Sequence, residues 1–127
     1  MICYMKYEEY LAKNTDLAIT INKEMAVFLS YEKTTIRFNS LRSIIGNSVY
    51  IDIGIMLLEA IRCKVQKILI LLEEQDHLVK ENETNAETKE AVLLQVSRYQ
   101  KLFEGHEQKY KGFIENISKL KAIENGG

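Results

Sequence analysis

Hydrophobic residues in the last third of the chain recur at helical spacing. From Val92 to Leu120 the steps alternate between four and three residues, the heptad repeat of a helix that buries one stripe of side chains. The members of this row are Val92, Val96, Tyr99, Phe103, His106, Tyr110, Phe113, Ile117 and Leu120. Leu102 and Ile114 widen the row, which favours a helix that contacts two neighbours. The pattern predicts a helix over about residues 86–123.

The middle third is apolar over a still broader arc. One row contains Ile51, Leu58 and Val65, and an adjoining row contains Ile61 and Ile68. A helix that is apolar on two adjoining faces is typical of the centre of a bundle or of the core of an oligomer. We therefore expect the second helix, over about residues 48–81, to be the central one.

The first third supports two interpretations. Read as one helix over about residues 5–45, its apolar residues form a single stripe. Read as strands, residues 18–21, 34–38 and 49–53 alternate in polarity and are rich in β-branched side chains. We favour the helix, because neither Gly nor Pro interrupts residues 7–45.

Two polar breaks separate these segments. At the first, Gly46 suits the left-handed backbone that ends a helix, and Asn47 or Ser48 can cap the next one. At the second, Thr84 and Glu87 stand three residues apart, as a capping box requires. Each break is short enough to reverse the chain direction between neighbouring helices.

These features predict an all-α fold, an elongated antiparallel three-helix bundle with coiled-coil-like seams. One domain accounts for all 127 residues, and the absence of proline permits helices of this length. A share of 46% hydrophobic and 28% charged residues is typical of a folded chain and not of a disordered one. The alternative is an α+β fold, in which an N-terminal β-meander precedes a long helical hairpin.

The charge, the cysteine content and the absence of long apolar stretches limit the expected partners and cellular location of the protein. A net charge of -1 with few arginines does not favour a nucleic-acid binder. Cys3 and Cys63 have no metal-binding spacing, and two cysteines are too few for a disulfide framework. No secretory signal follows the candidate start residues Met1 and Met5, and no apolar stretch reaches the ~18 residues of a membrane span. We expect a cytoplasmic protein that does not enter the membrane.

Candidate chemistry is sparse. The two histidines, His77 and His106, belong to no zinc-binding pattern, and neither a phosphate-binding loop nor a nucleophile elbow is present. Arg98 and His106 lie too far apart, and on different helix faces, to match the Arg–His pair of the helical HEPN ribonucleases. The sequence therefore predicts no enzyme activity, no cofactor and no metal.

A polar layer is expected halfway along the bundle. If the turns are centred near residues 46 and 83, Glu32, Arg62 and His106 come to the same height on the three helices. A buried imidazole needs hydrogen-bond partners, and a nearby acid favours its charged form. We interpret the layer as a device that sets the register, with a pH-sensitive or partner-sensitive joint as the alternative.

Two surfaces are candidates for binding a partner. Tyr4, Tyr7 and Tyr10 are expected to extend past the end of the second helix as an exposed aromatic overhang. The second candidate is a line of residues that recurs every seven positions on the third helix and consists of Arg98, Gly105, Gly112 and Lys119. Its glycines, each costing ~1 kcal/mol relative to Ala, suggest a shallow groove with basic ends for an acidic partner, although they also fit a tolerated kink.

The function that we expect is a non-enzymatic protein-binding module, chaperone- or inhibitor-like, which caps or sequesters a protein partner. This expectation follows from fold-level analogy with small cofactor-free bundles. The alternative is a structural, self-associating bundle, a homodimer that acts as an assembly adaptor. Nucleic-acid binding by the basic stretch over residues 101–121 is a third hypothesis.

Overall fold

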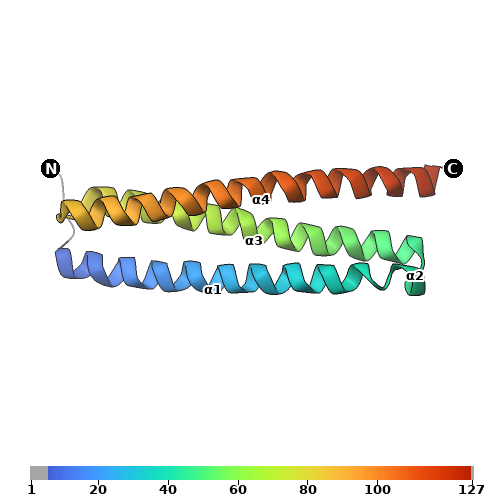
Figure 1. The fold of residues 1–127 in the computed structure, drawn as a ribbon, viewed down its shortest axis with the longest axis horizontal. Helices are drawn as coiled ribbons and strands as arrows, with labels where there is room; N and C mark the ends of the chain where they lie inside the picture. The colour runs from blue at the N-terminus through green and yellow to red at the C-terminus, as the bar shows by residue number, and fades with distance from the viewer. Residues whose placement is uncertain (1–5, 127) are drawn as a thin grey trace.

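A computed structural model describes the backbone of residues 6–126 and the side chains of residues 6–123, and it shows an elongated bundle of helices (Figure 1). The helices are α1 (Tyr7–Asn39), α2 (Arg42–Ile45), α3 (Asn47–Asn82) and α4 (Ala86–Gly126). The short α2 lies at the turn between α1 and α3, and α3 runs antiparallel to both α1 and α4 (Figure 1). Residues 6–126 contain no strand, so the all-α prediction is confirmed and the α+β alternative is wrong for this part of the chain.

The central position of α3 follows from its two apolar rows. Ile61, Val65 and Ile68 are fully buried, because one side of α3 packs along α1 and the adjoining side packs along α4. The backbones of α1 and α4 stand further apart from each other than either does from α3. The three long helices therefore form an open array with α3 in the middle. Because α1 and α4 lie apart, the side of the array between them is not covered by another helix.

The first predicted helix is broken near its end. α1 stops at Asn39, and Ser40 and Leu41 form a turn before the single turn of α2. The Ser40 hydroxyl donates to the Arg37 carbonyl oxygen at 2.7 Å, and its backbone N–H donates to the same oxygen at 3.2 Å. The backbone N–H groups of Ser40 and Leu41 bond to carbonyl oxygens three residues back instead of four, so the α-helical pattern of α1 ends at Asn39.

The first turn resembles its prediction only in part. Gly46 has a positive φ of 84°, as a glycine at a break can, but its ψ of 158° is extended and not that of a left-handed helix end. Asn47 is already the first residue of α3, and its side-chain oxygen accepts a hydrogen bond from Arg42 Nε at 3.2 Å. The cap expected from Asn47 or Ser48 is absent, since α3 has no side-chain cap.

At the second turn the capping residue is Asn85. Its side-chain oxygen accepts a hydrogen bond from the backbone N–H of Thr88 at 3.0 Å, which satisfies a free donor of the first turn of α4. The predicted capping box of Thr84 and Glu87 is therefore replaced by a cap one residue later. Thr84 and Asn85 are both residue types that can cap a helix. Asn85 is the cap because α4 begins at Ala86.

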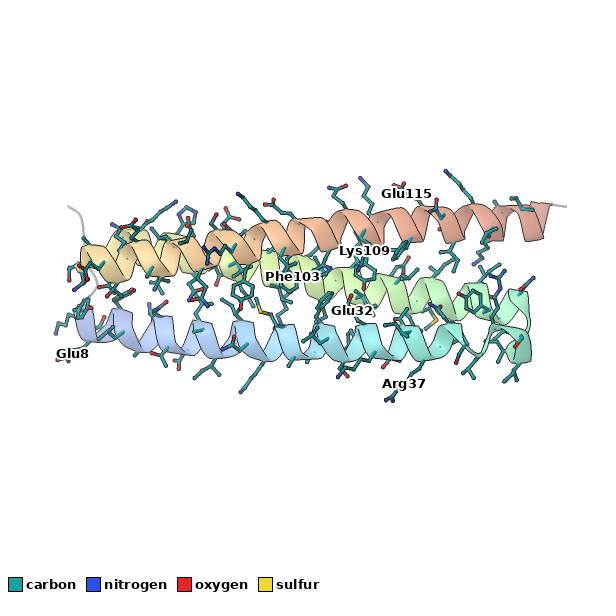
Figure 2. All side chains as sticks on the ribbon, viewed as in Figure 1. Glu8, Glu32, Arg37, Phe103, Lys109 and Glu115 are labelled. Carbon is teal, nitrogen blue, oxygen red and sulfur yellow. The ribbon has the colours of Figure 1, made fainter. Side chains whose placement is uncertain are left out.

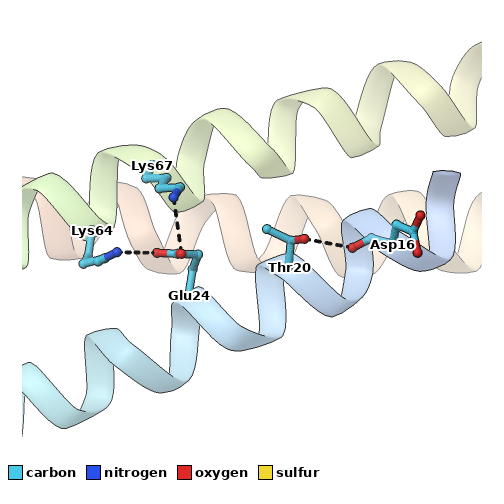
Figure 3. A network of polar contacts seen from close by, with 5 residues as sticks. All are labelled: Asp16, Thr20, Glu24, Lys64 and Lys67. Atoms are coloured by element: carbon cyan, nitrogen blue, oxygen red, sulfur yellow. Dashed lines mark hydrogen bonds and ion pairs between the residues drawn. The ribbon is translucent and has the colours of Figure 1, made fainter.

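Ion pairs across the α1–α3 seam show the helix register (Figure 3). The Glu24 carboxylate is held by Lys64 Nζ at 2.8 Å and by Lys67 Nζ at 3.3 Å, while within α1 the Thr20 hydroxyl donates to the Asp16 carbonyl oxygen (Figure 3). A turn centred at residue 46 places Lys64 beside residue 29 instead. The true register is shifted because residues 40–46 form a wider connection, whose centre lies earlier in the chain.

Candidate binding surface

The heptad row of α4 is divided into covered and uncovered members. Val96, Phe103 and Tyr110 are 2%, 3% and 5% exposed, and they face the core between the helices. The intervening members Tyr99, Phe113 and Leu120 are 36%, 47% and 43% exposed. A row that the sequence presents as one seam therefore has one side packed in the bundle and one side open to solvent.

A group of rings joins α1 to α4 in the middle of the rod, and we call it the aromatic bridge: Phe28, Phe103, His106 and Tyr110. The ring of Phe28 on α1 lies 5.2 Å from Phe103 and 4.8 Å from His106, measured between centroids. Phe103 lies in the space between the two helices (Figure 2). Large rings are needed here, because the backbones of α1 and α4 do not approach closely.

Two hollows lie on either side of the aromatic bridge. The larger groove, of about 420 Å³, lies toward α2, with walls from α1 and α4 and a floor from α3. The smaller hollow, of about 190 Å³, lies toward the α3–α4 turn. We call the side of the bundle that contains both hollows the open face, and its residues include Met25, Glu32, Ile36, Tyr99, Lys109, Phe113 and Leu120.

Gly54 on α3 gives the larger groove part of its floor. This glycine is buried, and a Cβ atom built on it would lie only 2.9 Å from Cδ1 of Ile117. The missing side chain therefore lets Ile117 of α4 lie directly against the backbone of α3. Ile117 and Leu58 make the base of the groove apolar, while Phe113 and Leu120 stand at its edge.

The residues of the predicted polar layer take different partners in the structure. Glu32 accepts a hydrogen bond from the Tyr110 hydroxyl and lies 3.6 Å from Lys109 Nζ, and these groups lie on the side of α1 that faces α4 (Figure 2). Arg62 Nε donates to Glu107 at 2.8 Å. The geometry therefore resolves the expected layer into separate α1–α4 and α3–α4 pairs.

His106 belongs to the aromatic bridge instead of to an ion pair. Burial lowers the pKa of its imidazole, the positive charge of Lys109 lowers it further, and the carboxylate of Glu32 opposes both effects. The expectation that a nearby acid makes the charged form the favoured one is therefore wrong. Desolvation by the surrounding rings outweighs attraction to an acid that is already paired with Tyr110 and Lys109.

Two of the three tyrosines of the predicted overhang, Tyr7 and Tyr10, lie at the end of the rod opposite α2. Tyr4 is outside the described residues; Tyr7 is 44% exposed, but Tyr10 is only 1% exposed. Both hydroxyls donate to the Glu83 carboxylate, at 3.0 Å and 2.9 Å, and Glu83 also accepts the backbone N–H of Asn85. The overhang prediction is thus wrong for Tyr10, because the α3–α4 turn covers the beginning of α1.

We call this group of Tyr7, Tyr10, Glu83 and Asn85 the Glu83 cap. The hydrogen bond from Asn85, followed by those from the two tyrosines, lowers the pKa of the Glu83 carboxyl despite its burial. Burial and the bond to Glu83 raise the pKa of Tyr10. The sequence did contain a signal for this contact, because Glu83 lies in a polar turn and Tyr7 and Tyr10 share one helix face. The predicted register did not bring these three residues into contact.

The predicted glycine line lies on the outside of α4. Arg98, Gly105 and Lys119 are exposed, and a Cβ atom built on Gly105 or Gly112 would meet nothing within 4 Å. None of the four residues lines either hollow. The two hollows described above therefore lie between helices and not along this line.

The open face suits an amphipathic segment, because its larger groove is mainly apolar, its smaller hollow mixes polar and apolar side chains, and Glu32, Arg42 and Lys109 supply charge. The part of the chain that the structure describes contains no group of three or more His, Cys, Asp or Glu residues placed to hold a metal ion. Among those same residues, no helix is both long enough and apolar enough to cross a membrane. Comparisons with protein-family models, curated proteins and solved structures found no match to this chain.

Proposed function

We propose that this protein is a non-enzymatic protein-binding module that takes up an amphipathic helix along the open face. The observation that carries the proposal is the divided row of α4, in which Tyr99, Phe113 and Leu120 remain half-exposed beside two hollows. A helix laid between α1 and α4 would cover these side chains. It would also complete a four-helix arrangement around the aromatic bridge.

The dimensions of the open face favour a helix over a small molecule. From Val92 to Leu120 the row spans about 42 Å at ~1.5 Å per residue, and hollows lie on both sides of the aromatic bridge. A partner helix would place its own apolar side chains at intervals of three and four residues, so successive side chains could enter the two hollows in turn.

The strength of such binding depends on several side chains acting together. Full burial of a large apolar side chain contributes about 1.5–3 kcal/mol, so covering the exposed half of Phe113 or Leu120 contributes about 1 kcal/mol. Association itself costs several kcal/mol in lost freedom. A partner must therefore cover most of the row, which supports a capping or sequestering role in the manner of a chaperone or inhibitor.

An acidic partner is a separate proposal, and it concerns the outer line of Arg98 and Lys119. That line lies away from the hollows, so charge alone would attract a partner there. Exposed charge pairs contribute little affinity by themselves. The open face is for this reason the primary surface of the proposal.

Photo-crosslinking in the source cells tests the proposed function. A photoreactive phenylalanine analogue replaces Phe113 on the open face, and in a matched control it replaces Glu115, which points away from α1 on the same helix (Figure 2). We expect protein adducts from position 113 and few from position 115. Equal labelling at both positions, or no adduct at position 113, would contradict the proposal.

A further inference from the structure

We infer that the occupant of the open face is a second copy of this chain, lying antiparallel to the first with the two open faces together. This inference rests on the proposed function, because it uses the same surface, and it replaces a single bound helix by two helices, α1 and α4, of a second copy. In such a pair, α1 and α4 of each copy would pack on α1 and α4 of the other. The interface would then be isologous, with one two-fold axis that crosses the rods near the aromatic bridge.

The distribution of charge along the rod determines the direction. The half that contains the α3–α4 turn is formed by residues 6–22, 66–85 and 86–104, and its Lys, Arg, Asp and Glu residues give a net charge of about −4. The half that contains α2, formed by residues 23–45, 47–65 and 105–123, has a net charge of about +4 by the same count. The rod is thus acidic at one end and basic at the other.

An antiparallel pair places each acidic end beside a basic end. A parallel pair would bring like ends together, and repulsion between like charges opposes that arrangement. The charge on each rod is therefore complementary to a reversed copy of itself. A partner with no opposite charge gradient would gain nothing from this feature.

The two hollows lie at matching distances from the proposed axis. Gln95 lines the smaller hollow eleven residues before His106, and Asn116 lines the larger groove ten residues after it. Both separations correspond to about 15–17 Å along α4. In an antiparallel pair, Asn116 of one copy would come level with Gln95 of the other, and the exposed rings at the larger groove would lie over the partner's smaller hollow.

The surface area of the single chain fits a molecule that buries one more face. Its accessible surface is 8734 Å². A compact monomer of 14.7 kDa is expected to expose about 6,900 Å², so the chain exposes about 1,800 Å² more. An elongated rod exposes more surface than a compact chain of the same mass, and the excess lies within the range that each subunit of an obligate homodimer buries, so pairing two rods side by side would cover much of it.

A second exposed apolar row lies on the outside of α3. It offers an alternative dimer interface against which the inference can be tested. Val49, Met56 and Ile70 are exposed at helical spacing, and none of them lines a hollow. Cys63 lies on the same row, seven residues after Met56 and seven before Ile70, and it is exposed. A dimer formed through this row would bring the two Cys63 thiols close together.

The first experiment measures the mass of the purified chain by light scattering over a range of concentrations. We expect a dimer, and we expect Phe113→Glu on the open face to weaken it by at least tenfold in Kd. Met56→Glu on the outer α3 row is the matched control and should leave the dimer intact. A natural chain that is monomeric throughout, or a dimer that only Met56→Glu weakens, would overturn the inference.

The second experiment reads the direction of the pair by disulfide trapping. In a chain with Cys3→Ser and Cys63→Ser, Gln95→Cys protein is mixed with Asn116→Cys protein and mildly oxidised. The antiparallel pair predicts disulfide-linked dimers that contain one chain of each variant, whereas a parallel pair keeps positions 95 and 116 about 30 Å apart along the rods and predicts no such mixed dimer. A third sample with Cys3→Ser alone keeps the natural Cys63, and efficient linkage through that thiol would instead assign the dimer to the outer α3 row.

These results also separate the inference from the proposed function. Adducts from position 113 to a different protein, together with a monomeric chain, would overturn the self-pair and support the binding module. A monomeric chain without adducts would contradict both. Because the cysteine variants leave Phe113 and Leu120 unchanged, the trapping experiment still decides the question if Phe113→Glu fails to fold.

Discussion

The two ends of the bundle are built differently: one is closed by hydrogen bonds, and the other contains the larger groove. At the end with the α3–α4 turn, the Glu83 cap bonds α1 to the turn, and Tyr10 is buried. At the end with α2, α1 and α4 diverge around a groove of about 420 Å³ whose edge includes Phe113. A short connection bearing one carboxylate closes the first end. The second end has a wider connection and a groove between its outer helices.

The largest expected effect comes from removing a ring at each end. Tyr10→Ala deletes a buried ring and the partner of Glu83, so it should lower the free energy of unfolding by about 3–5 kcal/mol. Phe113→Ala removes a half-exposed ring and should cost about 1 kcal/mol or less. Chemical denaturation at a concentration where the chain is monomeric compares the two. Similar losses would show that the two ends do not differ as described.

A smaller effect is expected from removing only the hydroxyl groups of the Glu83 cap. Tyr10→Phe leaves a buried carboxylate oxygen without its donor and should cost about 1–3 kcal/mol. Tyr7→Phe should cost less, because the side chain of Tyr7 is partly in water and solvent can replace its bond to Glu83. Denaturation of both variants beside the natural chain measures the difference. An equal loss in the two would mean that burial does not set the strength of this cap.

Glycine substitutions test the floor of the open end against the outer surface. Gly105→Ala should stabilise the protein by about 0.5–1 kcal/mol, because the new methyl group meets no neighbour and alanine favours a helix. Gly54→Ala should gain less, since its methyl group must displace Cδ1 of Ile117 from a distance of 2.9 Å. Thermal unfolding compares the pair. A larger gain at Gly54 would show that the groove floor is less tightly packed than the structure indicates.

The smallest effect is expected on acidification, through the aromatic bridge between the two ends. The pKa of His106 is lowered from 6.5 by burial and by Lys109, so the unfolded chain binds this proton more tightly than the folded one. Its contribution to stability is present above about pH 6.5 and is lost as the pH falls through that value toward the lower folded pKa. The free energy of unfolding should therefore decrease between about pH 7 and about pH 5.

His106→Gln should flatten this dependence, and His77→Gln, which changes an exposed histidine on α3, serves as the control. An unchanged slope in His106→Gln would contradict the assignment to the aromatic bridge. The Glu83 carboxylate affects stability in a separate, lower pH range. The pKa of Glu83 is lowered below 4.5, so the stability that this carboxylate supplies is lost only as the pH falls below about that value.

Local sequence was sufficient to find the three long helices and to place α3 between the other two. Its apolar residues fill two adjoining faces, and no arrangement with α3 at the edge could bury both. The break after Asn39 was missed because the apolar stripe continues across it and neither Gly nor Pro marks it. The burial of Tyr10 was missed because the Glu83 carboxylate that accepts its hydrogen bond lies 73 residues away along the chain, beyond the reach of a local pattern.

Spacing along the chain by itself determined that Val96, Tyr99, Phe103, Phe113 and Leu120 share one side of a helix. Only the tertiary structure decided which of them are covered, because α3, together with the ring of Phe28 on α1, buries only part of so wide an arc. A heptad repeat predicts that these side chains pack against an apolar neighbour. Whether that neighbour comes from the same chain depends on how far apart α1 and α4 lie, and the rings of the aromatic bridge occupy the space between them.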